Sequence, residues 1–472
     1  MRRSQNESWM AGAIIAGLLV APSASVGQEP QTREIPAAPP AYKLLRFDED
    51  YSYLAGAVPE TDWLDPIKYI PLGSNPKWFM TLGGELRERF EGAKNPGFGV
   101  KGDHDAYLLE RATLLVDLHL GERLRVFAEG ISGIIAGQSR PAPPVQNDPI
   151  DLQAAFVDLV PYVTSEDRLT LRAGRFAMSL GSGRLVATRA APNIPFRFDG
   201  FELLYSHLDW KATAFLTRPA KDSGAFDGDD HSTAFGGVYL TGWLAASRAL
   251  GVDLYYLGIR RKNGKYASGS GDEHRHSFGA REFGQWQHWD WDAEEVLQFG
   301  RFHGDPILAW TASIDAGHTW ELPWKPRLGA KLDVASGDRD AKDHHLGTFD
   351  ALFFKSGYFN DASLIRPQNV IDVHPKLALQ LSESVSADSS VDVFWRYSRS
   401  DAVYAVPGPV ALRADEGASA YVGTAVDVNM EWRLDRHLSV QASYVHFFVG
   451  DYPERVGGRD VDFGSTTLSF LF

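Results

Sequence analysis

Between Lys77 and Phe472 the sequence alternates between apolar and polar residues with a period of two, in blocks of about ten residues. The region contains no apolar run of the ~18 residues that a membrane-spanning helix needs. Because side chains of a strand point alternately to opposite faces, each block is predicted to be a strand with one apolar and one polar face. In the clearest block the apolar face holds Val422, Thr424, Val426, Val428, Met430, Trp432 and Leu434, and the polar face holds Asp427, Asn429, Glu431 and Arg433.

About eighteen such blocks follow one another, with starts near residues 77, 105, 123, 151, 168, 198, 208, 234, 249, 275, 289, 308, 326, 370, 389, 421, 437 and 462. An even number of strands is typical of bacterial outer-membrane barrels. We therefore predict an all-β fold, a transmembrane antiparallel β-barrel of about 18 strands over residues 77–472. A soluble sandwich also alternates, so the period alone leaves that alternative open. The longer connections Arg261–Arg275, Ser336–Asn369 and Ala402–Ala420 are predicted extracellular loops, and Leu434–His437 a periplasmic turn.

The N-terminus has the layout of a secretory signal: Arg2 and Arg3, an apolar run from Met10 to Val20, then small residues up to Gly27. We predict a signal peptide over residues 1–27, cleaved after general secretion, and a periplasmic N-terminal segment over residues 28–76. The last block, Phe463–Phe472, places Leu468, Phe470 and Phe472 on one face. This pattern resembles the assembly signal of outer-membrane barrels, so outer-membrane lipid and the barrel assembly machinery are expected partners.

Composition narrows the classes of function. The 61 acidic residues outnumber the 47 lysines and arginines, and a net charge of −14 argues against nucleic acid as a partner. The chain has no cysteine, so it has no disulfide and no thiolate metal site. Aromatic residues make up 12% of the chain, which suits strands and the aromatic girdles of a membrane barrel.

Weaker signals point to other chemistry. The loop sequences Asp227–Asp230 and Ser336–Asp340 carry oxygen ligands for Ca²⁺ without the full spacing of a calcium loop, and we interpret them as solvated turns. The histidines His274, His276, His344 and His345 are interpreted as loop residues. A barrel enzyme would need His119 or His374 as a base beside Ser132 or Ser382, and nothing in the sequence brings these together. We predict no catalytic residue, no metal and no cofactor.

A series of short stretches resembles one known family. They include Leu82–Arg89, Leu108–Arg111, Asp117–His119, Asp151–Asp158, Arg172–Arg175, Gly181–Val186, Pro192–Asn193, Phe198–Gly200, His276–Arg281, Gln298–Gly300, Thr348–Phe353, and Tyr444–Phe447 with Gly450. Their order and spacing, over nearly all of the chain from Leu44 to Phe472, resemble the alginate export family. The resemblance implies an eighteen-stranded outer-membrane barrel with an arginine-lined conduit for an anionic polysaccharide.

Arginine suits such a conduit, because its guanidinium is always charged and can pair with a carboxylate through two hydrogen bonds. Between Asp167 and Asp199 the sequence has six arginines and no acid, against an acidic background. The candidate conduit residues are Arg87, Arg89, Arg111, Arg125, Arg175, Arg184, Arg189, Arg197 and Asp199. The alternative is that these arginines cap a loop or neutralise acids across the barrel interior.

The leading hypothesis is passive export of alginate or a similar anionic polysaccharide or oligosaccharide, driven by its gradient or by periplasmic export proteins. A general or small-solute porin for sugar acids is the alternative.

Overall fold

The computed structural model describes residues 40–56, 62–99, 102–139, 141–222, 224–244, 247–340, 342–406 and 410–472. The predicted signal peptide lies outside the described residues. The described part begins with the 3-10 turns η1 (Arg46–Asp48) and η2 (Ser52–Leu54), the helix α1 (Asp65–Lys68) and the two-residue strand β1 (Ile70–Pro71). Two more short helical elements, η3 (Pro144–Gln146) and α2 (Asp451–Arg455), lie in connections between strands. Among these residues no helix has the length and apolar character to cross a bilayer.

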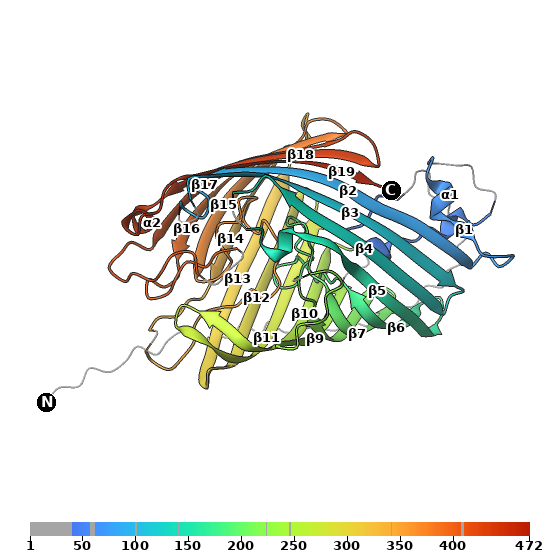
Figure 1. The fold of residues 1–472 in the computed structure, drawn as a ribbon, viewed down its shortest axis with the longest axis horizontal. Coiled ribbons are helices and arrows are strands. Elements are labelled where there is room, and N and C mark those ends of the chain that lie inside the picture. Colours follow the sequence, from blue (N-terminus) through green and yellow to red (C-terminus); the bar gives the residue numbers. More distant parts are fainter. Residues whose placement is uncertain are drawn as a thin grey trace.

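In the described part of the chain, eighteen strands form the wall of a closed barrel (Figure 1). They are β2 (Trp78–Lys94), β3 (His104–Leu120), β4 (Leu124–Ala136), β5 (Asp148–Val163), β6 (Asp167–Phe176), β7 (Phe198–His207), β8 (Trp210–Pro219), β9 (Thr233–Trp243), β10 (Leu250–Tyr266), β11 (Gly269–Trp286), β12 (Trp289–Phe302), β13 (Asp305–Thr319), β14 (Arg327–Ala335), β15 (Val370–Gln380), β16 (Val385–Arg396), β17 (Tyr421–Arg433), β18 (Leu438–Val449) and β19 (Val461–Leu471). Each strand pairs antiparallel with the next, and β19 pairs with β2. The predicted fold class is confirmed, and each predicted start has a strand near it.

The two ends of the barrel differ in their connections. Short turns such as Leu434–His437 join strands at the end where the C-terminus lies, and the long connections lie at the other end, where β10–β11 and β12–β13 are also joined by two-residue turns (Figure 1). The predicted loop Ser336–Asn369 is the whole connection between β14 and β15, and Ala402–Ala420 lies within the connection between β16 and β17. The predicted loop Arg261–Arg275 is wrong, because β10 and β11 continue through it as a hairpin. The long connection 177–197, between β6 and β7, was not predicted.

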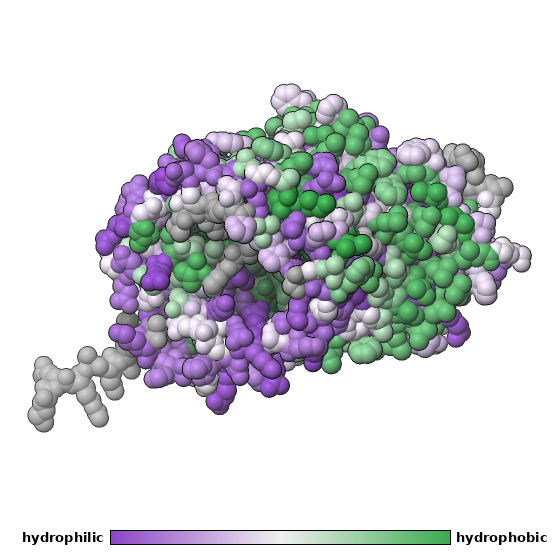
Figure 2. Space-filling view, in the orientation of Figure 1, coloured by the Kyte–Doolittle hydropathy of each residue, from purple (hydrophilic) through white to green (hydrophobic). Residues whose placement is uncertain are grey.

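The outer face of the wall is apolar. Figure 2 shows apolar surface over the half of the barrel toward the C-terminus and a polar surface at the long-loop end. Val428 and Met430 are 52% and 44% exposed, whereas Asp427 on the opposite face is 3% exposed. Exposed tryptophans at the short-turn end form part of an aromatic girdle: Trp78, Trp286, Trp289, Trp320, Trp324 and Trp432. The predicted faces of β17 are thus confirmed over most of its length.

Val422 departs from the predicted alternation. It is 1% exposed and belongs to the buried core, because the pairing of β16 with β17 shifts register between Phe394 and Trp395. Such an irregularity inserts one extra residue and turns the following side chains to the other face. The expectation that Val422 faces lipid is therefore wrong.

Long connections fold into the barrel and pack around aromatic side chains. Phe353 of the connection 336–369 contacts Phe198 and Phe235 of the wall, and Phe359 contacts Phe394. The connection 397–420 contributes the buried Tyr404. A water-filled barrel has no apolar core of its own, so the loops supply one. The long-loop half of the interior is consequently packed with side chains.

The N-terminal segment enters the barrel from the short-turn end. Phe47 of η1 packs edge-to-face on Phe127 of β4 and Phe156 of β5, both buried on the inner side of the wall. Arg172 of β6 lies over the Phe47 ring at 4.6 Å. Residues 42–54, which belong to the predicted periplasmic segment 28–76, thus lie across the short-turn mouth.

Candidate functional site in the barrel interior

Two cavities lie inside the short-turn half of the barrel, and Phe47 borders both. The first, of about 550 Å³, is lined by the N-terminal segment, the inner faces of β2 to β5, β18 and β19, and residues of the inward connections. The second, of about 470 Å³, lies toward the short turns and is lined by η1, η2 and the ends of β3 to β8. The N-terminal segment therefore lies between two cavities of the interior.

The first cavity is basic. Its lining contains five cationic side chains, Lys43, Arg46, Arg87, Arg89 and Arg111, against three carboxylates, Glu85, Glu129 and Asp361. In a chain with a net charge of −14, this is a local reversal of sign. A chamber with excess guanidinium raises the local concentration of anions.

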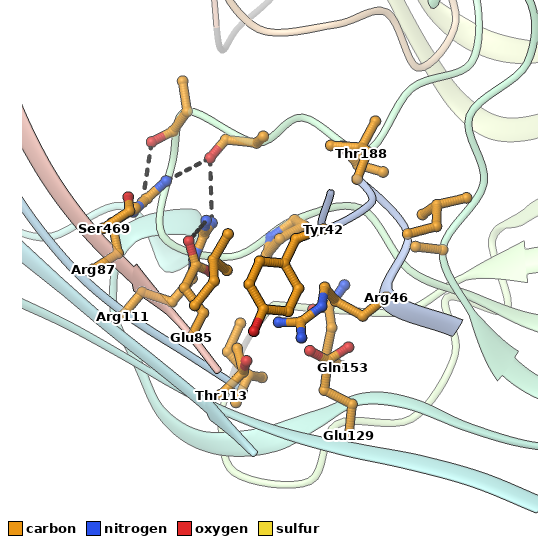
Figure 3. A pocket seen from close by; sticks show the side chains of 18 of the residues that line it. Tyr42, Arg46, Glu85, Arg87, Arg111, Thr113, Glu129, Gln153, Thr188 and Ser469 are labelled. Atoms are coloured by element: carbon orange, nitrogen blue, oxygen red, sulfur yellow. Dashed lines mark hydrogen bonds and ion pairs between the residues drawn. The ribbon is translucent and has the colours of Figure 1, made fainter. Parts of the chain in front are cut away.

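Arg87 and Arg111 are neighbours across β2 and β3, where the strand register pairs them directly (Figure 3). Alternation sends both side chains inward, while Leu86 points outward and is 53% exposed. Arg87 Nη1 donates to the carbonyl oxygen of Ala190 at 2.7 Å, and Arg111 Nη1 donates to the same oxygen at 3.2 Å. Two like charges are held side by side by carbonyl dipoles of the inward connection 177–197.

The two arginines differ in their acidic partners. Arg111 Nε donates to Glu85 Oε2 at 2.9 Å. Arg87 donates to the carbonyl oxygens of residues 190–192 and to Asn193 Oδ1, and within the described residues it forms no ion pair with a carboxylate. Among the described residues, the direct contacts of the Arg87 guanidinium are thus made to carbonyl and amide oxygens.

Two other predicted residues hold inserted segments to the wall. Arg89 of β2 donates to both oxygens of Asp361, in the connection 336–369, at 2.8 and 2.9 Å. Arg125 of β4 donates to Asp117 at 2.8 Å and to the carbonyl oxygen of Phe47 at 2.6 Å. Both are inside the barrel, as predicted, and each joins an inserted segment to a strand.

Three arginines of the acid-free run pair with acids from elsewhere in the chain. Arg184 pairs with Asp292 and Glu294 of β12 at 2.8 and 3.0 Å. Arg189 pairs with Asp222 at 3.1 Å, and the fully buried Arg197 pairs with Asp148 and Asp151 at 3.2 and 2.5 Å. Every one of these contacts fixes the connection 177–197 to the wall or to a neighbouring loop.

Arg175 and Asp199 lie on the other side of the wall. They pair in register between β6 and β7, and Arg175 Nε donates to Asp199 Oδ1 at 2.8 Å. Asp199 shares its face with Phe201, which is 68% exposed, while Phe198 and Glu202 of the opposite face are buried. The structure brings Arg87, Arg89 and Arg111 together in one cavity and leaves Arg175 and Asp199 on the outer face.

A model of the family described as alginate export matches residues 79–464, which is most of the chain. The chain belongs to the alginate export family. A search of curated protein sequences gave no match.

Solved structures of Pseudomonas aeruginosa outer-membrane proteins resemble this alginate export family barrel in fold. OpdK is 12% identical with a TM-score of 0.58, and the match covers 83% of this chain and 98% of OpdK. OccK8 (OprE) is 11% identical with a TM-score of 0.56 and the same coverage. OccK2 (OpdF), solved in complex with glucuronate, is 12% identical with a TM-score of 0.56, again covering 83% and 98% of the two chains.

Sequence reasoning missed Arg46, which this alginate export family barrel places in the first cavity (Figure 3). Arg46 lies in the segment predicted as periplasmic, so no strand alternation indicated its direction. One signal was present in Gly83 and Gly84 of β2. A Cβ at Gly83 would lie 2.9 Å from Lys68 Nζ and 3.3 Å from Arg46 Nη2, so the glycine leaves room for the inserted segment.

The weaker sequence signals have ordinary structural roles in this family member. Asp230 accepts hydrogen bonds from Ser232 within a turn, as the solvated-turn interpretation expects. His274 and His276 lie in strand β11, so their interpretation as loop residues is wrong. His119 contacts Asp117 and stacks on Phe79. No hydrogen bond between the described residues joins His119 or His374 to Ser132 or Ser382.

Proposed function

We propose that this protein is an outer-membrane channel that lets an anionic saccharide cross passively, and that the leading substrate is an acidic polysaccharide such as alginate. The family assignment supports export of such a polymer. The single observation that carries the proposal here is the basic first cavity, in which Arg87 has no carboxylate partner among the described residues. The proposal involves no catalytic step.

The geometry of the cavity suits a uronate carboxylate. Arg46, Arg87 and Arg111 approach one another from the N-terminal segment, β2 and β3 (Figure 3). A guanidinium that now donates to carbonyl oxygens can exchange those bonds for a carboxylate, since hydrogen bonds to a charged acceptor are about twice as strong. The neighbouring Glu85 and Glu129 limit the net charge, so an anion would be attracted without being held permanently.

A second candidate is uptake of small sugar acids, and the size of the cavities favours it. Chambers of about 550 and 470 Å³ are in the range of small-molecule sites. OccK2 (OpdF), which shares the fold, was solved with glucuronate. For a polymer to pass, residues 42–54 must leave the mouth and the inward connections must shift, whereas a monosaccharide needs smaller displacements.

Planar-bilayer recordings of Arg87→Glu, Arg87→Lys and wild-type protein test the proposal. Arg248→Glu is a matched control, because Arg248 pairs with Asp209 on the exposed surface of a short turn. We expect Arg87→Glu to lower anion preference in a salt gradient and to weaken block by oligouronates, and Arg248→Glu to change neither. Arg87→Lys should retain the ion preference and lose part of the block, because lysine lacks the fork.

Heat-modifiable migration on gels must first show that each variant is folded. Folded Arg87→Glu with unchanged ion preference and unchanged block would contradict the proposal. Block by uronate oligomers of many sugars in the wild type supports polymer transport, whereas block by glucuronate alone supports the small-solute candidate.

Genetic context gives an independent test of direction and partners. We expect genes for a polymerase and an epimerase beside this gene if it serves export with periplasmic export proteins. A lyase and an uptake transporter at the same place would favour import. The proposal retains a signal peptide over residues 1–27 and delivery to the outer membrane of a Gram-negative cell.

A further inference from the structure

The inner face of β15, β16 and β17 carries a cluster of buried acids away from the basic cavity. Asp372 and Asp392 are 0% exposed, Asp427 is 3% exposed and His374 is 6% exposed. The ligand atoms of His374, Asp392 and Asp427 all lie within 4.8 Å of one another. We infer that His374, Asp392 and Asp427, with the carboxylate of Asp372 beside His374, form a binding site for one divalent transition-metal ion, of which Mn²⁺ and Zn²⁺ are the fitting representatives.

The unpartnered carboxylate of Asp372 is the observation that points to a bound ion. Neither of its carboxylate oxygens has a hydrogen-bond partner among the described residues, although the side chain is fully buried. Its Oδ2 lies 3.9 Å from His374 Nδ1, so the carboxylate is directed toward the cluster. A buried charge without a partner is strongly unfavourable, and such a group normally pairs or coordinates a metal.

Neighbouring polar groups donate to Asp392 Oδ2 and to both oxygens of Asp427, and they leave Asp392 Oδ1 and both oxygens of Asp372 without a donor. Asn360 donates to Asp392 Oδ2 at 2.6 Å, Ser390 donates to Asp427 Oδ2, and Asn429 donates to Asp427 Oδ1 at 2.6 Å. Asp392 Oδ1 lies 2.6 Å from His374 Nδ1 without forming an aligned hydrogen bond. Hydrogen bonds to the far oxygens of ligands are the usual support of a metal site.

Two lysines on the same wall form their ion pairs with other acids. Lys331 Nζ lies 2.9 Å from Asp333 Oδ2, and Lys376 Nζ lies 2.9 Å from Asp388 Oδ1. Three carboxylates therefore share one neutral or protonated imidazole. A divalent cation would compensate two of their negative charges. Carboxylates combined with one imidazole suit Mn²⁺ or Zn²⁺ better than Ca²⁺, because Ca²⁺ prefers oxygen ligands alone.

The site would also fix the position of a loop. Asn360 belongs to the connection 336–369, and its hydrogen bond to Asp392 joins this connection to a proposed metal ligand. An ion that orders Asp392 would therefore restrain the connection that fills the barrel.

Metal binding to full-length detergent-solubilised protein tests the inference. After treatment with EDTA and dialysis, equilibrium dialysis with MnCl₂ or ZnCl₂ should give one ion per protein, measured by elemental analysis. Asp372→Asn and His374→Gln should each lower the affinity at least tenfold. Asp315→Asn is the matched control, because Asp315 is an interior acid paired with Arg327, and its affinity should equal that of the wild type.

Unfolding in heat gives a second readout that a purely structural cluster would not reproduce. Metal-free Asp372→Asn should unfold at or above the wild-type temperature, because the change removes an unpartnered charge, and only the wild type should gain stability from added metal. If Asp372→Asn does not fold, Asp427→Asn serves in its place. Three outcomes would overturn the inference. The wild type binds neither metal, the site variants bind as well as Asp315→Asn, or the protein binds Ca²⁺ alone. None of these outcomes depends on the substrate of the channel.

Discussion

Arg46 donates a hydrogen bond from Nη2 to the main-chain oxygen of Phe472, 3.0 Å away, and from Nη1 to the carbonyl oxygen of Gly84 at 2.8 Å. The N-terminal segment is thereby attached to the two strands, β19 and β2, at which the barrel closes. The segment is therefore held in the mouth by contacts to the seam of the barrel. This position makes the segment a candidate for control of passage.

The first prediction concerns the docking of that segment. Phe47→Ala removes the ring that packs on Phe127 and Phe156, and deletion of a buried phenylalanine side chain costs about 3–5 kcal/mol. We expect the segment to leave the mouth more often and single-channel conductance in planar bilayers to rise. Phe226→Ala, at an exposed loop position, should leave conductance unchanged. Equal conductance of Phe47→Ala and the wild type would show that the segment does not restrict the path.

The second prediction concerns pH. Burial, with the nearby Arg46 guanidinium as a further cause, lowers the pKa of Lys68 from 10.5 to about 7. A released Lys68 would regain its ordinary pKa, so between pH 7 and the onset of tyrosine ionisation, somewhat below pH ~10, the docked segment binds fewer protons than the released one. Burial raises the pKa of Tyr42 to about 12 and so opposes the effect above this window. Docking should therefore strengthen as pH rises through this window and be weakest below pH 7. Conductance should fall with rising pH in the wild type and lose this dependence in Lys68→Met.

The third prediction concerns the two faces of the wall. Val428 is 52% exposed on the outer face, so Val428→Arg should cost about 2–4 kcal/mol near the bilayer midplane. Gln441 lines the first cavity, and Gln441→Arg should be tolerated. Folding titrations in lipid vesicles measure both, and equal costs would mean that the assigned register is wrong. Asn429 is a poor control because it donates to Asp388 and Asp427.

The fourth prediction concerns the arginine run. Arg197→Met would leave Asp148 and Asp151 buried near one another without this partner, and breaking a buried pair costs about 3–5 kcal/mol. We expect a lower temperature for the shift in heat-modifiable gel migration. Arg248→Ala breaks an exposed pair with Asp209 and should change stability by at most about 1 kcal/mol. A similar shift for both variants would contradict a structural role for Arg197.

The wall could be predicted from sequence because its cause is local. A strand between lipid and water must alternate, and Val428, Asp427 and their neighbours show this directly. The sequence predicts a loop where β10 and β11 form a hairpin, because residues 263–272 are rich in glycine, serine and charge, which favour turns. The register shift that buries Val422 leaves no mark in a period-two pattern.

The interior was less predictable because its contacts join distant parts of the chain. Arg184 looked free of acids in sequence, but its partners Asp292 and Glu294 lie on β12. Arg87 and Arg111 were assigned to the interior by alternation alone, and that assignment is correct. Alternation does not predict which inward arginine pairs with a carboxylate. That pairing depends on how the connections 177–197 and 336–369 fold into the barrel.

β10 and β11 hold 17 and 18 residues, although about 9–11 residues cross a bilayer. At about 3.3 Å per residue and a tilt near 40°, such strands rise roughly 40 Å, against an apolar band of about 25 Å. The surplus forms a collar that stands in water, and Arg261 and Arg275 near its rim hold Asp350 and the carbonyl oxygen of Thr348. The connection that fills the barrel is thus held partly by a section of the wall that stands clear of the apolar band.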